Sequence, residues 1–122
     1  MGKLRAMKAR LRLPIQVARV AGESMAPTFA DGDLILLRNF DRVAKDLPLG
    51  TVVIIERELM PGVHFIKRIQ KSHSGAYWVE GDNRSVEVEP RVNDSRVWGY
   101  IPAHEIRGRV LMRIWPLRQR AR

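Results

Sequence analysis

The chain contains the stretch Val63-His64-Phe65-Ile66-Lys67-Arg68-Ile69-Gln70-Lys71, which follows the turn sequence Met60-Pro61-Gly62 and precedes a turn rich in Ser and Gly. Its length, its apolar residues and the turns on both sides predict a β-strand. Side chains alternate between the two faces of a strand, so Lys67 is expected to share its face with Phe65 and Ile69. The stretch therefore predicts a strand that carries one lysine on an apolar face.

The same strand pattern recurs along most of the chain. Further strands are predicted over residues 16–20, 34–38, 51–56, 76–80 and 108–115, with turns at Asp31-Gly32-Asp33 and Pro48-Leu49-Gly50. A long polar loop is predicted over 81–96, and a single helical turn over 102–106. Short strands separated by Gly and Pro predict an all-β fold, a compact open barrel or sandwich of mostly antiparallel strands with little helix.

The length of 122 residues corresponds to one domain. We expect a basic N-terminal tail over residues 1–14, which shows weak helical spacing at Leu4, Met7 and Leu11. The folded domain is predicted over residues 15–116, and a basic C-terminal tail over 117–122.

The net charge of +9 is concentrated at the two ends of the chain. Residues 1–20 and 113–122 hold ten of the 22 basic residues and no acidic residue, which leaves 12 basic and 13 acidic residues between them. A nucleic-acid-binding fold carries its basic patch on the folded body, so this distribution argues against nucleic acid as the partner. It suits solubility or peripheral contact with an anionic membrane.

The chain contains no cysteine, which excludes disulfides and thiolate metal sites. A transmembrane helix needs about 20 apolar residues, and the longest aliphatic run, around Val52-Val53-Ile54-Ile55, is far shorter. The basic N-terminus is not followed by the apolar segment of a secretory signal peptide. These features predict a cytoplasmic location, with membrane association as the alternative.

The chain contains three sequence motifs, called phrases below, in the following order from the N-terminus. The first is Gly22-Glu23-Ser24-Met25-Ala26-Pro27-Thr28, and the second is Phe65-Ile66-Lys67-Arg68-Ile69. The third combines Gly81-Asp82-Asn83 with Asn93-Asp94-Ser95-Arg96-Val97-Trp98-Gly99-Tyr100-Ile101-Pro102. Together they resemble the type I signal peptidase family of serine proteases, which use a Ser–Lys dyad. The resemblance covers roughly residues 17–115, nearly the whole chain.

The resemblance implies that Ser24 is the nucleophile and Lys67 the base. A lysine acts as a base only when neutral, and burial lowers its pKa from about 10.4 by disfavouring the charged form. The apolar face expected around Lys67 supports such burial. Gly22 and Met25 are expected to shape the nucleophile loop, and the backbone N–H of Ser24 is the expected oxyanion donor.

The other residues of the phrases are expected to support the site. They are Pro27, Thr28, Asp33, Arg68, Gly81, Asp82, Asn83, Asp94, Ser95 and Arg96. Asp94 is expected to form an ion pair with either Arg96 or Arg68.

Two positions depart from the family pattern. Gly22 stands where some members have a serine that completes the oxyanion hole, and Val92 stands where many have a serine that binds the catalytic lysine. Ser85 or Ser95 supplies a substitute contact, or packing alone holds Lys67, and the sequence leaves these possibilities open.

The implied function is a serine endopeptidase that removes an N-terminal leader, signal or propeptide from a precursor protein, which binds in extended conformation. The compact form is similar to the mitochondrial inner-membrane protease type and to a soluble bacterial type that matures nickel superoxide dismutase. The missing anchor favours the second type. A LexA-like self-cleaving repressor fragment and a non-catalytic basic binding module are the alternatives. The three histidines show no metal-like spacing, and no metal or cofactor is expected.

Overall fold

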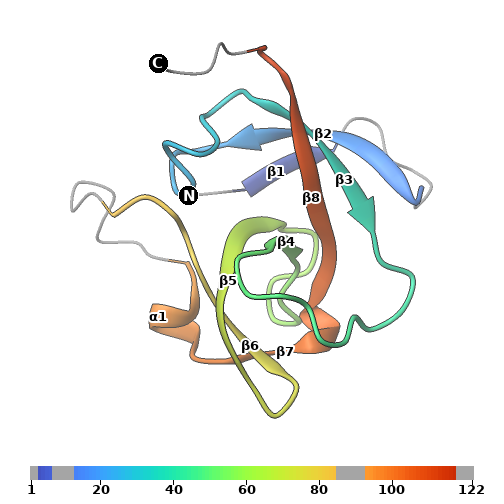
Figure 1. Cartoon of the computed structure of the whole chain (residues 1–122), viewed down its shortest axis with the longest axis vertical. Helices are drawn as coiled ribbons and strands as arrows, with labels where there is room; N and C mark the ends of the chain where they lie inside the picture. Colours follow the sequence, from blue (N-terminus) through green and yellow to red (C-terminus); the bar gives the residue numbers. More distant parts are fainter. Residues whose placement is uncertain (1–2, 7–12, 85–92, 118–122) are drawn as a thin grey trace.

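The computed structural model describes residues 3–6, 13–84 and 93–117 of the chain (Figure 1). Its strands are β1 (Lys3–Ala6), β2 (Ile15–Ala21), β3 (Leu34–Asn39), β4 (Val52–Ile55), β5 (Phe65–His73), β6 (Ala76–Glu80), β7 (Ile101–Pro102) and β8 (Ile106–Trp115). Within the described ranges, helical structure is confined to the short α1 (Ser95–Trp98) and the 3-10 turn η2 (Ala103–Glu105). The all-β prediction is therefore confirmed.

All eight strands belong to one antiparallel sheet in the order β1-β2-β3-β8-β4-β5-β6-β7. The long β8 joins the upper strands of Figure 1, β1 to β3, to the lower strands, β4 to β7. A further pairing between β1 and β5 brings the sheet back on itself. The sheet is therefore a partly closed barrel, in which β6 and β7 extend beyond the closure.

The core consists of two apolar clusters, and β4 and β5 contribute to both because their side chains alternate faces. Ile66 packs in the cluster with Met25 and Ile35, whereas Phe65 and Ile69 pack in the other. The expected apolar face of β5 is thus confirmed, and Lys67 lies between two members of the second cluster.

Most predicted elements match the observed ones. The predicted strand 76–80 coincides with β6, and the other predicted strands differ from the observed ones by one or two residues at their ends. The predicted helical turn contains η2.

The structure differs from the sequence prediction in three short elements. Residues 3–6, within the segment of weak helical spacing, form strand β1. The predicted loop 81–96 ends in the first turn of α1, and β7 was not expected. Tertiary pairing overrides weak local preference in such short segments.

Residues 85–92 of that loop, with Ser85 and Val92, lie outside the described residues, as do 7–12 and 118–122 of the two tails.

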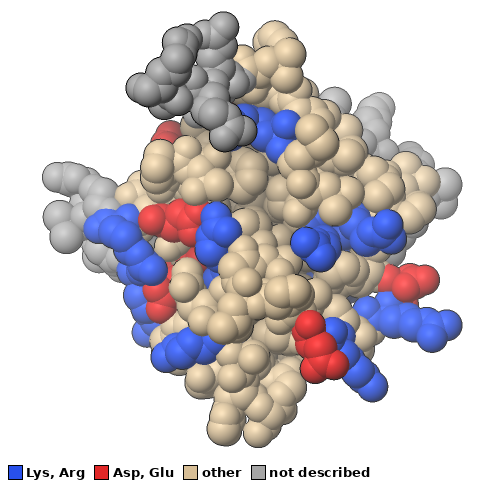
Figure 2. All heavy atoms as spheres, viewed as in Figure 1, with Lys and Arg blue, Asp and Glu red and all other residues tan. Residues whose placement is uncertain are grey.

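Basic side chains on the face shown in Figure 2 occur in separate groups, several of them beside acidic ones. No helix among the described residues has the length and apolar character needed to cross a membrane.

Candidate active site

Ser24 lies in the turn region between β2 and β3. Gly22 has a φ of 95°, a conformation that favours glycine, and its N–H donates a hydrogen bond of 2.7 Å to Asp31 Oδ1. Met25 is fully buried in the first apolar cluster. The turn is therefore held at one end by a hydrogen bond and at its centre by a core side chain, with Ser24 between them.

The Ser24 hydroxyl is buried, and it has no hydrogen-bond partner among the described residues. Leaving a buried polar group unpaired costs about 1–3 kcal/mol, so such groups are rare and call for an explanation. The hydroxyl is not hydrogen-bonded to Lys67 in this state. Hydrogen bonds between reacting groups are often long in a free enzyme and shorten when substrate binds.

Gly81 brings the serine turn and strand β5 together. A Cβ added at Gly81 would lie 2.6 Å from the Ser24 carbonyl oxygen and 3.3 Å from Ser24 Cβ. In the antiparallel pairing of β5 with β6, Arg68 lies opposite Glu80. Continuing this register by one residue places Gly81 beside Lys67. Ser24 and Lys67, which are far apart in sequence, therefore flank the same glycine.

Lys67 is only 2% exposed, and its backbone pairs with Val53 of β4. Burial disfavours the ammonium form and lowers the pKa of Lys67 from 10.5 to about 8. The negative charge of Asp94 opposes this shift, and the positive charge of Arg96 adds to it. With a pKa of about 8, about a tenth of the molecules carry a neutral amine at pH 7. The strand thus holds a lysine that exchanges its proton near neutral pH.

Asp94 connects three parts of the site. Its carboxylate accepts hydrogen bonds from the Arg96 guanidinium at 2.8 and 3.1 Å, from the Arg96 backbone N–H at the start of α1, and from the Gly81 N–H. Burial alone raises the pKa of Asp94, but these hydrogen bonds outweigh it and hold the pKa below its ordinary value. Of the two partners left open by the sequence, Arg96 is the one that pairs with Asp94. Asp94 makes no ion pair with Lys67.

Arg68 pairs instead with Asp82. Two parallel hydrogen bonds of 2.9 and 2.7 Å join the guanidinium to the carboxylate, and the Thr28 hydroxyl donates a third of 2.7 Å. Burial alone raises the pKa of Asp82, and the hydrogen bonds from Arg68 and Thr28 reverse the shift and lower it. Asp82 therefore fastens the segment after Ser24 to the strand that carries Lys67.

Asn83 secures the serine turn from the other side. Its backbone N–H donates to the Ser24 carbonyl oxygen at 2.8 Å, and its side-chain amide donates to the Glu23 carbonyl oxygen at 2.9 Å. The Gly-Asp-Asn phrase thus contacts the serine turn through each of its three residues.

The remaining predicted residues lie around this centre. Ser95 is buried, and its hydroxyl accepts a hydrogen bond from the Val79 N–H at 2.9 Å. Buried Asp33 accepts from the Ala30 N–H, and exposed Pro27 follows a cis peptide bond. The structure thus brings the predicted residues together around Ser24 and Lys67, while their roles in a reaction remain predictions.

Comparison with known proteins identifies the family. A model of the family described as signal peptidase, peptidase S26, matches residues 7–70, about half of the chain. Mitochondrial inner membrane protease subunit 1 of Homo sapiens is 32% identical over 121 residues, which cover 83% of this chain and 70% of that protein. The chain belongs to the signal peptidase family, peptidase S26. It is therefore a peptidase of the kind that removes leader peptides from precursor proteins.

Two further relatives carry similar names. Mitochondrial inner membrane protease subunit 1 of Xenopus tropicalis is 30% identical to the peptidase over 84% of this chain and 70% of that protein. The Arabidopsis thaliana relative, mitochondrial ATP-independent inner membrane protease subunit 1a, is 28% identical over 86% of this chain and 73% of that protein. These relatives correspond to one of the two compact types expected from the sequence. They do not test the resemblance to the maturation protease of nickel superoxide dismutase, which stays a prediction.

Arg113 also belongs to this region, although it lies outside the sequence motifs that predict the site. It donates a hydrogen bond of 2.9 Å to the Thr28 carbonyl oxygen and lies 3.7 Å from Asp33 Oδ2. In the sequence it is only one charge of the basic C-terminal end. No local pattern distinguishes it, because its partners are far away in sequence.

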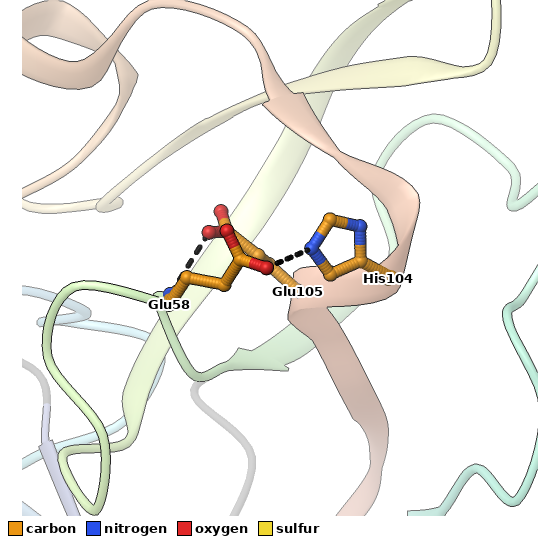
Figure 3. A group of neighbouring side chains, drawn as sticks. All are labelled: Glu58, His104 and Glu105. Carbon is orange, nitrogen blue, oxygen red and sulfur yellow. Dashed lines mark hydrogen bonds and ion pairs between the residues drawn. The ribbon is translucent and has the colours of Figure 1, made fainter.

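A group of three titratable side chains lies away from this centre. Glu58, His104 and Glu105 place their ligand atoms within 4.8 Å of one another (Figure 3). The Glu105 carboxylate is already engaged, because one oxygen lies 2.6 Å from Arg57 Nε and the other accepts from the Glu58 N–H. A guanidinium in this position repels a cation, so the group is better described as an ion-pair network that anchors the segment after β4. Sequence spacing had indicated no such grouping around His104.

Replacing Gly81 by alanine tests the close contact with Ser24. Because the new Cβ would lie 2.6 Å from the Ser24 carbonyl oxygen, the Gly81→Ala variant must displace the serine turn. We expect a loss of about 1–3 kcal/mol in unfolding free energy and at least a tenfold lower kcat/KM for peptide hydrolysis. Ser72→Thr adds a methyl group at an exposed position and serves as the control. Unchanged hydrolysis by Gly81→Ala would show that the turn tolerates displacement.

Replacing Lys67 by methionine tests the cost of the buried amine. The folded pKa of about 8 lies below the ordinary lysine value of 10.5, so between these values the unfolded chain binds more protons and stability rises with pH. Below pH 8 the full cost of the buried charge is present. We expect Lys67→Met to be more stable than wild type by about 1–3 kcal/mol at pH 7, and by less at pH 9.5, in urea unfolding. The exposed Lys45→Met is the control, and an equal difference at both pH values would contradict the interpretation.

Proposed function

We propose that the peptidase is a serine endopeptidase in which Ser24 is the nucleophile and Lys67 the general base. The observation that carries the proposal is the buried lysine with a pKa of about 8 beside Gly81, which packs closely against Ser24. The buried Ser24 hydroxyl has no hydrogen-bond partner among the described residues. A serine needs a neighbouring base to become nucleophilic, and a lysine with a lowered pKa fills that role.

The reaction follows from these two groups. Ser24 Oγ attacks the scissile carbonyl carbon while neutral Lys67 Nζ takes the hydroxyl proton, and the backbone N–H of Ser24 is the expected donor to the oxyanion. Collapse of the tetrahedral intermediate breaks the C–N bond, and the Lys67 ammonium gives its proton to the leaving amine. Lys67 then takes a proton from the water that attacks the acyl-enzyme ester. Deacylation releases the carboxylate product and returns the proton to Ser24.

The supporting residues have distinct parts in this proposal. The ion pair between Asp94 and Arg96 puts two opposing charges near Lys67, so that neither charge alone sets its pKa. Asp82 and Asn83 hold the serine turn against β5. Such positioning matters because displacement of a reacting group by about 1 Å is worth about a hundredfold in rate.

The proposed substrate is a precursor protein whose N-terminal leader binds in extended conformation. The maturation of nickel superoxide dismutase is the specific candidate from the sequence resemblance. The names of the relatives favour a second candidate, processing of precursors at a membrane as one subunit of a larger protease. Peripheral contact of the basic ends with anionic lipid would serve the second candidate.

Replacing Ser24 by alanine tests the nucleophile and the substrate together. We expect Ser24→Ala to lose hydrolysis entirely, because no other group replaces the attacking oxygen. Its unfolding free energy should be equal to or higher than that of wild type, because a buried hydroxyl without a partner among the described residues is removed. Protein N-termini compared between source cells with wild-type and Ser24→Ala enzyme should show uncut precursor. Accumulation of one precursor would indicate a dedicated maturation protease, and accumulation of many exported proteins a general one. Hydrolysis by purified Ser24→Ala near the wild-type rate would contradict the dyad.

The pH dependence of hydrolysis tests Lys67 as the base. Only the neutral amine accepts a proton, so kcat/KM should rise about tenfold per pH unit below about pH 8 and level off above it. The measurement uses a fluorogenic peptide between pH 6 and 9.5, with circular dichroism at each pH to show that the fold is retained. A flat profile over this range would exclude a lysine base.

A further inference from the structure

Strand β1 occupies the sheet edge beside the proposed dyad. Its backbone pairs with β2 from Lys3 opposite Ala21 to Ala6 opposite Ala18. Lys3 also lies opposite Phe65 of β5. Ala21 is three residues before Ser24, and Phe65 is two residues before Lys67. The chain's own N-terminal segment therefore lies where β2 and β5 converge on the site.

The remaining edges of these strands are already paired. The other edge of β2 pairs with β3. β5 pairs with β4 on one side over residues 65–68, and with β6 on the other side only from Arg68 onward. The backbone beside the dyad that is open to another strand is thus one edge of β2 and the start of β5. β1 takes both.

An extended peptide that adds to a sheet needs such an edge, because its affinity comes from main-chain hydrogen bonds. We propose that β1 is an intramolecular competitor of the peptide substrate, held in the strand-binding slot between β2 and β5. The proposal rests on the proposed function, since it takes Ser24 and Lys67 as the place where substrate is cut. A precursor must displace β1 from this slot before its scissile bond reaches Ser24.

The direction of β1 explains why it competes without being cut there. A leader lying along residues 18–21 with its C-terminal end at Ser24 must run parallel to β2. β1 runs antiparallel to β2, so its N-terminal end points toward the serine turn. It fills the slot without presenting a peptide bond in the orientation of a leader.

The extent to which β1 weakens substrate binding depends on the length of β1 and on the length of its connection to β2. Eight residues, 7–14, connect β1 to β2, and a short connection gives an effective concentration in the millimolar range. A strand of four residues pairs only marginally by itself, so occupancy of the slot is partial. The apparent substrate affinity is the intrinsic affinity multiplied by the fraction of molecules with a free slot. We therefore expect β1 to weaken substrate binding by about two- to tenfold.

A reversible cross-link tests the proposal in the full chain. Arg5 and Arg19 are directly opposite each other in the β1–β2 pairing, and the chain has no natural cysteine. In the Arg5→Cys/Arg19→Cys variant, oxidation should lock β1 in the slot and reduction should free it. The control, His73→Cys/Ala76→Cys, cross-links a directly opposite pair of β5 and β6 near their connecting turn.

The readout is binding of a fluorescein-labelled synthetic peptide that carries Ala-x-Ala, the small-residue pattern at which secretory leaders are cut, measured by anisotropy in the Ser24→Ala background. We expect the oxidised lock to bind at least tenfold more weakly than its reduced form, with no change in the control. Equal affinity in both forms would overturn the proposal. Because binding is measured without catalysis, this result is independent of whether Ser24 is the nucleophile, which hydrolysis by the single Ser24→Ala variant decides.

A second variant weakens β1 instead of locking it in the slot. Leu4→Pro/Arg5→Pro weakens β1, since prolines remove ladder donors at two successive positions. We expect a two- to tenfold lower KM with unchanged kcat, because only access to the slot changes. Leu117→Pro/Arg118→Pro removes the same residue types at the other end and serves as the matched control. An unchanged or higher KM would show that β1 builds the slot instead of blocking it.

Discussion

Lys67 places an ionisable amine in the interior of β5, between two residues of an apolar cluster. Water is excluded there, so the charged form is disfavoured, and this single cost links the stability of the fold to the chemistry available to it. The same strand pairs with β4, β6 and, at one point, β1, so the lysine cannot leave without disturbing the sheet. A residue that weakens the fold at neutral pH is thus held where the proposed reaction needs a base.

The geometry around this lysine is built from contacts between distant parts of the chain. Gly81 is the narrowest point, because no side chain fits between its backbone and Ser24. Asp82 and Asn83 follow immediately and bind the serine turn, while Asp94 reaches back to the Gly81 N–H. Three phrases of the sequence thus act as one unit, and their charges are paired locally instead of being directed at the amine.

In our proposal, closure of the sheet and access of a substrate to the site compete for the same backbone. The barrel closes through β1, and β1 closes it beside Ser24 and Lys67. An open edge would suit an extended substrate, yet an unpaired edge also invites association with other chains. A short strand covers this edge, and in our proposal a substrate can still displace it.

Local sequence patterns determined most of the strands and pointed to the candidate site residues. Alternation placed Lys67 on the apolar face of a strand, Gly and Pro marked the turns, and β6 lies where its pattern predicted it. Only tertiary structure decided that Asp94 pairs with Arg96 and Arg68 with Asp82, that Arg113 supports Thr28, and that residues 3–6 form a strand. A strand's period depends on neighbouring residues and is readable from them, whereas a partner across the sheet depends on how the whole chain closes, which no local pattern contains.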